Sequence, residues 1–203
     1  MDGSLYRWFN RLADRTSWAH GVMKFYASNG IVAFGGLILL VYVLAWRHDD
    51  HRGVAAAVWA GGAALVSLLV GQLVGGPINR ARPYETMPSM QVLIERTSDF
   101  SFPSDHALVS GAVAACLLFA DRRWGIVACV AAGLMALARV YVGAHYPGDV
   151  AAGLLFGAVG AIAGGYLLVP VLNRVVDRLV RTPLRPLLSA RRPAPALIDV
   201  RDV

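Results

Sequence analysis

The sequence predicts an all-α fold, an integral membrane helical bundle of five or six transmembrane helices. Two observations support this prediction. Of the 203 residues, 57% are hydrophobic and 16% are charged, with a mean hydropathy of +0.54, whereas soluble domains carry about 25% charged residues. The chain also contains several uncharged apolar runs, and a bilayer core of about 30 Å requires roughly 20 such residues per helix.

The apolar runs predict five membrane-spanning helices. Three runs meet this requirement directly, namely residues 30–46, 54–76 and 150–172. Two shorter runs, 107–120 and 124–138, reach it when the polar residues at one end are included. The last of the five carries glycines three or four residues apart, which permit close helix contact. We expect this contact within the chain rather than between copies, and the oligomeric state stays open.

Residues 1–28 predict an amphipathic helix at the membrane interface. Apolar residues recur there at helical spacing, with arginines between them: Leu5, Trp8, Phe9 and Leu12, with Arg7, Arg11 and Arg15. A sixth, irregular span through residues 18–26 is an alternative, although Lys24 argues against it, and a solvated tail is another.

The positions of the arginines predict how the protein is oriented in the membrane. If the long loop 77–103 faces outward, the short links 47–53 and 121–123 and a basic tail, residues 173–203, face the cytoplasm. Most arginines then lie inside, as in other membrane proteins. The net charge of +6 is thereby explained as a topology signal, without a nucleic-acid partner.

Three polar segments are predicted to meet on the outward side of the bundle. They are "NRARPY" at 79–84, "FPSDHA" at 102–107 and "ARVYVGAHYPGDVAAG" at 138–153. Each joins a predicted span to a loop or link, so a helical bundle can bring them together. Arginine, serine, histidine and aspartate in one place suggest phosphate chemistry.

Three of these residues are suited to holding a phosphate. Arg82 and Arg139 carry planar guanidinium groups that bind phosphate oxygens in bidentate fashion. Ser104 follows a proline at a predicted helix start, where it can cap the helix and where free backbone N–H groups attract an anion.

Three others are suited to catalysis. Of His106 and His145, one neutral imidazole can attack phosphorus while the other protonates the departing oxygen. Asp149, four residues after His145, can hold that imidazole in one tautomer. Such a reaction needs no metal-bound hydroxide. The structural alternative is that "GAHYPGD" at 143–149 is only a turn.

The residues "RP" at 82–83, "PSDH" at 103–106 and "RVYVGAHYPGD" at 139–149 resemble the three signature motifs of the type 2 phosphatidic acid phosphatase (PAP2) superfamily. The resemblance implies a PAP2/haloperoxidase-like core over residues 29–172. It also implies roles for the site residues. His145 would be the nucleophile that forms a phosphohistidine, Asp149 its orienting partner and His106 the general acid. Arg82, Ser104 and Arg139 would hold the phosphate, without a metal or other cofactor.

The sequence departs from the family pattern at two positions. The first motif normally opens with a lysine seven residues before the arginine of "RP", and Gly75 stands there. Arg80 is the nearest candidate to replace that cation. Asp105 stands where most of the family has glycine, and "PSDH" is similar to the undecaprenyl-diphosphate phosphatase branch.

The resemblance therefore implies an enzyme of the bacterial cytoplasmic membrane with its site on the outer face. We expect it to hydrolyse undecaprenyl or another polyprenyl diphosphate to the monophosphate, which would recycle the carrier lipid of cell-wall synthesis. Phosphatidic acid and phosphatidylglycerol phosphate are alternative substrates. A non-catalytic phospholipid-binding or carrier protein would use the same arginines, and the missing lysine favours that alternative.

Overall fold

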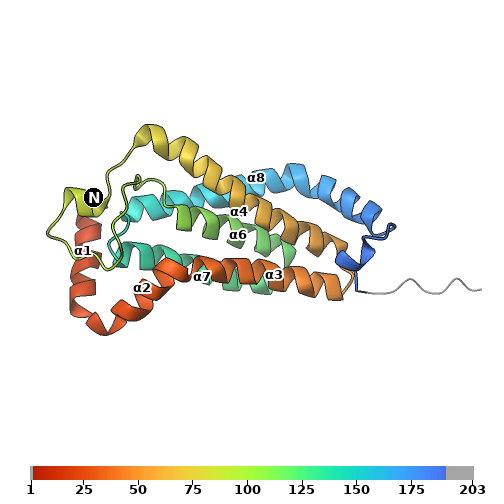
Figure 1. The fold of residues 1–203 in the computed structure, drawn as a ribbon, viewed down its shortest axis with the longest axis horizontal. Coiled ribbons are helices and arrows are strands. Elements are labelled where there is room, and N and C mark those ends of the chain that lie inside the picture. The colour runs from red at the N-terminus through yellow and green to blue at the C-terminus, as the bar shows by residue number, and fades with distance from the viewer. Residues whose placement is uncertain (1, 191–203) are drawn as a thin grey trace, which may run out of the picture.

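The computed structural model describes residues 2–190, which form helices and connecting loops without a strand (Figure 1). In chain order the helices are α1 (Asp2–Arg15), the 3₁₀ turn η1 (Ser17–Ala19), α2 (His20–Asn29), α3 (Ile31–Arg47), α4 (His51–Ile78), α5 (Pro83–Thr86), α6 (Asp105–Ala120), α7 (Arg122–Tyr141), α8 (Pro147–Leu179) and the 3₁₀ turn η2 (Arg185–Leu187). The all-α prediction is confirmed.

Each of the five predicted apolar segments lies in a helix, namely α3, α4, α6, α7 and α8. By length and composition, α4, α7 and α8 can each cross a membrane. The segments 17–29 and 31–47, bent by 58° relative to each other, make a fourth span if counted as one. The predicted count of five or six is therefore confirmed only in part. α8 ends at Leu179, beyond the predicted end at residue 172.

The remaining apolar helix, α6, lies at the centre of the bundle. It contacts α4, α7 and α8, and every residue from Ala107 to Leu117 is buried. Small residues allow the close packing: a Cβ atom at Gly157 would lie 2.0 Å from the Leu108 carbonyl oxygen, and one at Gly111 would lie 2.4 Å from that of Leu154. Gly153, Gly157 and Gly164 of α8 thus pack within the chain as predicted, whereas a Cβ atom at Gly160 would have nothing within 4 Å.

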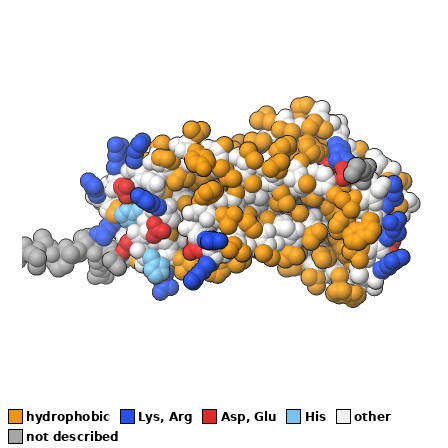
Figure 2. Space-filling model, turned by 180° about the vertical axis from the view of Figure 1, so that it is seen from behind, with side chains coloured by type: hydrophobic (Ala, Val, Ile, Leu, Met, Phe, Trp, Pro, Cys, Tyr) orange, Lys and Arg blue, Asp and Glu red, His pale blue; other side chains and the backbone are white. Residues whose placement is uncertain are grey.

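The outer surface is that of a multi-pass membrane protein. A broad band of hydrophobic side chains covers the middle of the molecule, and charged side chains gather at its two ends (Figure 2). The long helices carry exposed apolar residues, among them Leu69 and Leu73 on α4 and Leu155 and Leu167 on α8. Water would not favour so large an apolar surface, whereas lipid does.

The N-terminal helices lie at one end of the bundle, where α1 crosses the ends of the other helices (Figure 1). Asn10 fastens α1 to the loop 87–104, because its side chain donates to the Gln91 carbonyl oxygen at 2.7 Å and accepts from the Gln91 N–H at 3.1 Å. Leu5 and Trp8 point outward and are about half exposed. α1 also brings three arginines to this end, so the arginines are distributed less one-sidedly than the sequence predicted.

The region predicted as a basic tail begins inside α8. After α8 ends, the chain returns to α3, where the Trp46 indole donates to the Pro186 carbonyl oxygen at 2.8 Å and the Tyr42 hydroxyl donates to that of Leu187. The last residues of the predicted tail, 191–203, lie outside the described residues.

Candidate active site

A cavity of about 510 Å³ opens at the end of the bundle that carries α1 and the loop 87–104. Its walls come from α2, the residue that precedes α5, this loop, the first turn of α6, the last turn of α7 and the α7–α8 link. The residues that line it are Lys24, Ser28, Arg82, Ile94, Glu95, Thr97, Asp99, Phe100, Pro103, Asp105, His106, Arg139 and His145. Five of the eight predicted site residues are thus brought together here.

His145 lies in the short link between α7 and α8, and its side chain is 2% exposed. The link turns sharply at Gly143, whose φ of +83° favours glycine. His145 Nδ1 lies 2.8 Å from the Ser101 carbonyl oxygen. Because a carbonyl only accepts, this contact assigns the proton to Nδ1 and leaves the lone pair on Nε2.

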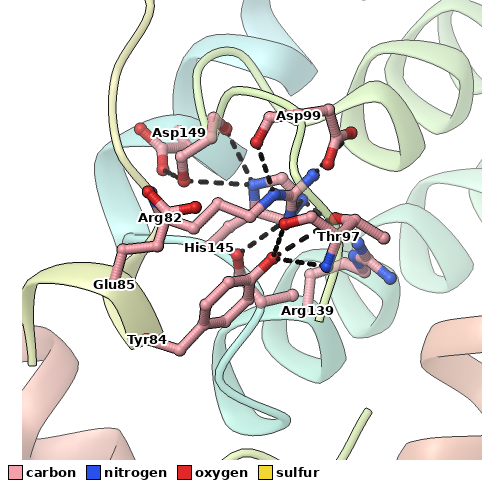
Figure 3. Close-up of polar contacts among 10 residues, drawn as sticks. Arg82, Tyr84, Glu85, Thr97, Asp99, Arg139, His145 and Asp149 are labelled. Atoms are coloured by element: carbon pink, nitrogen blue, oxygen red, sulfur yellow. Dashed lines mark hydrogen bonds and ion pairs between the residues drawn. The ribbon is translucent and has the colours of Figure 1, made fainter. Parts of the chain in front are cut away.

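Two guanidinium groups face this lone pair. His145 Nε2 lies 3.3 Å from Arg82 Nη1 and 3.2 Å from Arg139 Nη2 (Figure 3). Burial of the imidazole, followed by the positive charges of Arg139 and Arg82, holds the pKa of His145 well below its ordinary value. The imidazole is therefore neutral, the form in which Nε2 can act as a nucleophile.

Arg82 is fixed in place by the loop 87–104. Its Nη2 donates to Asp99 Oδ2 at 2.9 Å, and its Nε donates to the Asp99 carbonyl oxygen at 3.1 Å. Its Nη1 also donates to the Ala144 carbonyl oxygen at 3.1 Å. Burial alone would raise the pKa of Asp99, but hydrogen bonds from Thr97 and Arg82 and the Arg82 charge lower it. Asp99 is thus an ionised partner that orients the guanidinium.

Two buried donors have no partner within residues 2–190. They are Nε of Arg139, which lines the cavity, and the hydroxyl of Ser104, which does not line it but stands in the chain between the lining residues Pro103 and Asp105. Ser104 occupies the N-cap position of α6 as predicted, but its side chain makes no capping hydrogen bond. Its hydroxyl therefore stays available to another acceptor. Because buried donors are nearly always satisfied, these two groups indicate a ligand that supplies oxygen acceptors, as a phosphate does.

Asp105 lines the cavity from the first turn of α6, where His106 follows it. Asp105 Oδ1 is buried without a partner in the described part of the chain. This oxygen is directed at α4, because a Cβ atom at Gly71 would lie 3.1 Å from it. The structure thus brings the carboxylate to the cavity wall and turns one of its oxygens toward the neighbouring helix.

Asp149 reaches His145 through Ser101 and not by direct contact. Its Oδ2 accepts from the Ser101 hydroxyl at 2.5 Å and from the Tyr146 N–H at 3.0 Å. The Ser101 carbonyl oxygen, in turn, holds His145 Nδ1. The reason lies in the local fold, since Asp149 occupies the first turn of α8 and its carboxylate bends back to cap that helix.

Arg80 faces carboxylates rather than the cavity. Its Nη1 donates to Asp149 Oδ1 and its Nη2 to Asp2 Oδ2, each at 2.6 Å. Its guanidinium also stacks on the Tyr146 ring, 4.0 Å from the centroid. Within this structure Arg80 therefore supports the start of α8 and does not replace the missing cation of the first motif.

The space next to position 75 is too small for a lysine side chain. A Cβ atom at Gly75 would lie 2.1 Å from Phe100 Cε2 and 2.5 Å from the Phe102 carbonyl oxygen. Phe100, which lines the cavity, thus fills the space that a longer side chain at 75 would enter. Position 75 cannot supply a cation without movement of the loop.

Ser101, Asp99 and the α2 residues of the cavity were not predicted as site residues from the sequence. Ser101 stands between two aromatic residues just before "PSDH", and this position is the one signal that could have drawn attention to it. Asp99 lies in a loop whose course the sequence does not specify. No group of three or more His, Cys, Asp or Glu residues within 2–190 is placed to hold a metal ion.

Comparison with known proteins identifies the family. The sequence profile of the PAP2 superfamily matches residues 56–171. The chain is 30% identical to the bacitracin transport permease protein BcrC of Bacillus licheniformis, over 77% of this chain and 75% of the relative. It is 27% identical to the undecaprenyl-diphosphatase BcrC of Bacillus subtilis, over 89% of this chain and 91% of the relative.

Other relatives are named for different lipids. A lipid A 1-phosphatase of Rhizobium johnstonii is 42% identical over 96 residues, which is 44% of this chain and 38% of the relative. The fold is similar to the crystal structure of Aquifex aeolicus LpxE, with a TM-score of 0.64 and 22% identity over 79% of this chain and 92% of that chain. The chain therefore belongs to the PAP2 superfamily and is a membrane lipid phosphatase.

Proposed function

We propose that the protein hydrolyses a polyprenyl diphosphate, with undecaprenyl diphosphate as the favoured substrate, to the monophosphate and inorganic phosphate. The proposal rests on the neutral imidazole of His145, whose Nε2 lone pair faces the guanidinium groups of Arg82 and Arg139. The "PSDH" sequence and the similarity to an undecaprenyl-diphosphatase along nearly the whole chain support the choice of lipid.

In the first step, His145 Nε2 attacks the terminal phosphorus. The bond between that phosphorus and the bridging oxygen breaks, which gives a phosphohistidine and the polyprenyl monophosphate. His106, at the cavity wall, protonates the departing oxygen. Arg82, Arg139 and the free Ser104 hydroxyl hold the three non-bridging oxygens, where negative charge is concentrated in the transition state.

In the second step, water attacks the phosphohistidine. His106, now unprotonated, accepts a proton from this water, and the bond between phosphorus and Nε2 breaks to release inorganic phosphate. The imidazole regains its lone pair, and His106 regains the proton that it gave in the first step. The chain's own groups thus complete the cycle without a metal ion.

The placement of the cavity suits a lipid substrate. It lies at the end of the bundle, beside the apolar band of Figure 2. A phosphorylated headgroup can occupy it while the hydrocarbon tail remains beside the long helices. We further propose that this end faces the outside of the cytoplasmic membrane, where the protein would recycle a cell-wall carrier lipid.

The orientation can be tested with single cysteines in a cell. A cysteine at the exposed Ser89, in the loop 87–104, should react with a membrane-impermeant maleimide added from outside, whereas one at Arg123, in the α6–α7 link, should not. The background protein should have both native cysteines replaced by serine. The reverse labelling pattern would place the site on the cytoplasmic face.

The activity is tested by phosphate release from purified protein in detergent with excess chelator. The substrates are undecaprenyl diphosphate, phosphatidic acid and phosphatidylglycerol phosphate. The proteins are the wild type, His145→Ala and, as a matched control, His48→Gln at the exposed opposite end. We expect chelator-resistant release that prefers the diphosphate, that is lost in His145→Ala and that is retained in the control.

Other outcomes separate the alternatives. A preference for phosphatidic acid or phosphatidylglycerol phosphate would keep the enzyme and change its substrate. No release from any lipid, together with retained headgroup binding in His145→Ala, would indicate a binding or carrier protein. Trapping of an acid-labile, alkali-stable phosphate on the peptide that contains His145 would identify the covalent intermediate directly.

A further inference from the structure

The helix α2 is set at an angle to α3 and lines the active-site cavity. The segments 17–29 and 31–47 meet at Gly30 with a bend of 58°. A Cβ atom at Gly30 would lie 2.5 Å from the Tyr26 carbonyl oxygen and 2.8 Å from Met135 Cε, so the helix approaches α7 closely at this point. The Tyr26 hydroxyl strengthens this packing, because it donates to the Ala131 carbonyl oxygen on α7 at 2.9 Å.

α2 reaches the catalytic residues themselves. Arg139 Nη1 donates to the Ala27 carbonyl oxygen at 3.1 Å. Lys24 and Ser28 lie three residues before and one residue after Ala27, four positions apart, and therefore share one helix face. Both line the same cavity as His145. An ammonium group and a hydroxyl from α2 thus belong to the site, although α2 lies outside the residues that match the family.

Lys24 is the only lysine in the sequence. It is exposed, and it has no hydrogen-bond or ion-pair partner within the described chain. Arg82, by contrast, is paired with Asp99 at 2.9 Å. The carboxylates Glu95, Asp99 and Asp105 line the cavity too, but none of them pairs with Lys24 in the described chain. An anion bound in the cavity would be attracted by Lys24 together with the two guanidiniums. Lys24 therefore carries a positive charge, unpaired within residues 2–190, that is suited to binding an anion in the cavity.

The two arginines cannot by themselves account for a diphosphate. Both converge on His145 Nε2, so both serve the one phosphoryl group under attack. A lipid diphosphate brings a second phosphate, which becomes the leaving group and needs its own cation. Neither Gly75 nor Arg80 can supply that cation, for the steric and ion-pairing reasons given above.

We propose that Lys24 and Ser28 bind the second phosphate of a lipid diphosphate and make the enzyme selective for diphosphates over monophosphates. This assignment rests on the proposed function. Lys24 contacts a non-bridging oxygen of the leaving phosphate, and Ser28 donates a hydrogen bond to the same group. A monophosphate substrate has no group at this position, so its hydrolysis does not depend on Lys24.

The kinetic test compares farnesyl diphosphate with farnesyl monophosphate, which share one tail. Removal of a charged hydrogen bond in Lys24→Gln should lower kcat/KM for the diphosphate by about 10- to 100-fold and for the monophosphate by less than about threefold. Lys24→Arg should restore most of the diphosphate activity. Arg15→Gln is the matched control, because it removes one exposed positive charge from the same end without lining the cavity.

A binding test does not require turnover. In the His145→Ala protein, acetic anhydride should acetylate the single lysine side chain, and mass spectrometry of its peptide measures the rate. We expect pyrophosphate to slow acetylation of Lys24 at least about tenfold more effectively than orthophosphate at equal concentration, in keeping with a charged contact.

The outcomes distinguish this inference from the proposed function. Equal losses for both farnesyl substrates in Lys24→Gln would assign Lys24 to the reacting phosphate, and no loss for either would remove it from the site. Equal protection by pyrophosphate and orthophosphate would also overturn the assignment. Failure of the wild type to hydrolyse any diphosphate, with selective protection of Lys24 retained, would instead overturn the catalytic proposal and leave the binding site standing.

Discussion

The indirect link between Asp149 and His145 gives the most discriminating prediction. If the carboxylate acts only through Ser101, then Ser101→Ala and Asp149→Asn interrupt the same path. Their effects on kcat/KM should not multiply in the double variant. A carboxylate that contacts the imidazole directly, as in a catalytic triad, would act without Ser101.

The size of the effect follows from the contacts. Ser101→Ala removes a hydrogen bond to a charged group, worth about 1.5–3 kcal/mol between its partners. The carboxylate keeps its bonds to the Tyr146 N–H and Arg80, and His145 Nδ1 keeps the Ser101 carbonyl oxygen. About half of the bond energy, roughly 0.8–1.5 kcal/mol, should therefore reach the imidazole, which corresponds to about a four- to twelvefold loss of kcat/KM.

The assay is a double-mutant cycle on kcat/KM for the diphosphate, with thermal unfolding in detergent as a check that each variant is folded. We expect the double variant to be about as active as the poorer single variant, which gives a coupling energy of about 0.8–1.5 kcal/mol. Losses that multiply, with coupling below about 0.5 kcal/mol, would refute the path through Ser101. A Ser101→Ala enzyme as fast as the wild type would refute it as well.

Three further predictions concern other parts of the site. Because burial and two guanidiniums lower the pKa of His145, its neutral form persists as the pH falls, so the acid limb of kcat/KM should lie below about 6.5; a pH–rate profile with a limb above that value would contradict it. Arg82→Lys should lower kcat/KM by about 10²–10³-fold, because an ammonium cannot bind Asp99 and the phosphate together; near-normal kinetics would show that the guanidinium is not needed to bind both. Gly75→Lys should destabilise the protein by about 1–3 kcal/mol through its clash with Phe100 and the Phe102 carbonyl oxygen, and Phe100→Ala in the same chain should relieve part of this loss in thermal unfolding; unchanged stability in Gly75→Lys would show that the loop moves aside at little cost.

The sequence was informative where local pattern and membrane geometry are sufficient. Apolar runs fix where helices lie, and polar residues at the ends of those runs must gather at one side of the bilayer. For this reason Arg82, His106, Arg139 and His145 could be predicted to meet, and they line one cavity. The helix count was harder, because α6 is enclosed by other helices and needs less apolar length than a lipid-facing span.

The remaining features depend on tertiary structure that no local pattern specifies. Asp99 and Ser101 act only because the loop 87–104 folds across the end of the bundle. Asp149 lies at helical spacing from His145, which suggested direct contact, but capping of α8 turns its carboxylate toward Ser101. Lys24 looked like an argument against a membrane span, and its place in the cavity follows from a bend that the sequence does not reveal.

The N-terminal helices give the catalytic end of the bundle properties that the family core lacks on its own. Asp2 Oδ1 accepts from the Gly148 N–H at 2.9 Å, and its Oδ2 pairs with Arg80, which also pairs with Asp149. Because Asp149 is hydrogen-bonded to Ser101, whose carbonyl oxygen contacts His145, the position of His145 depends on α1 as well as on the core. The same segment presents Lys24 to the cavity through α2. On our proposal, residues of the core carry out the hydrolysis of the phosphate, whereas placement of the nucleophile and selection of a diphosphate depend on residues that precede the core.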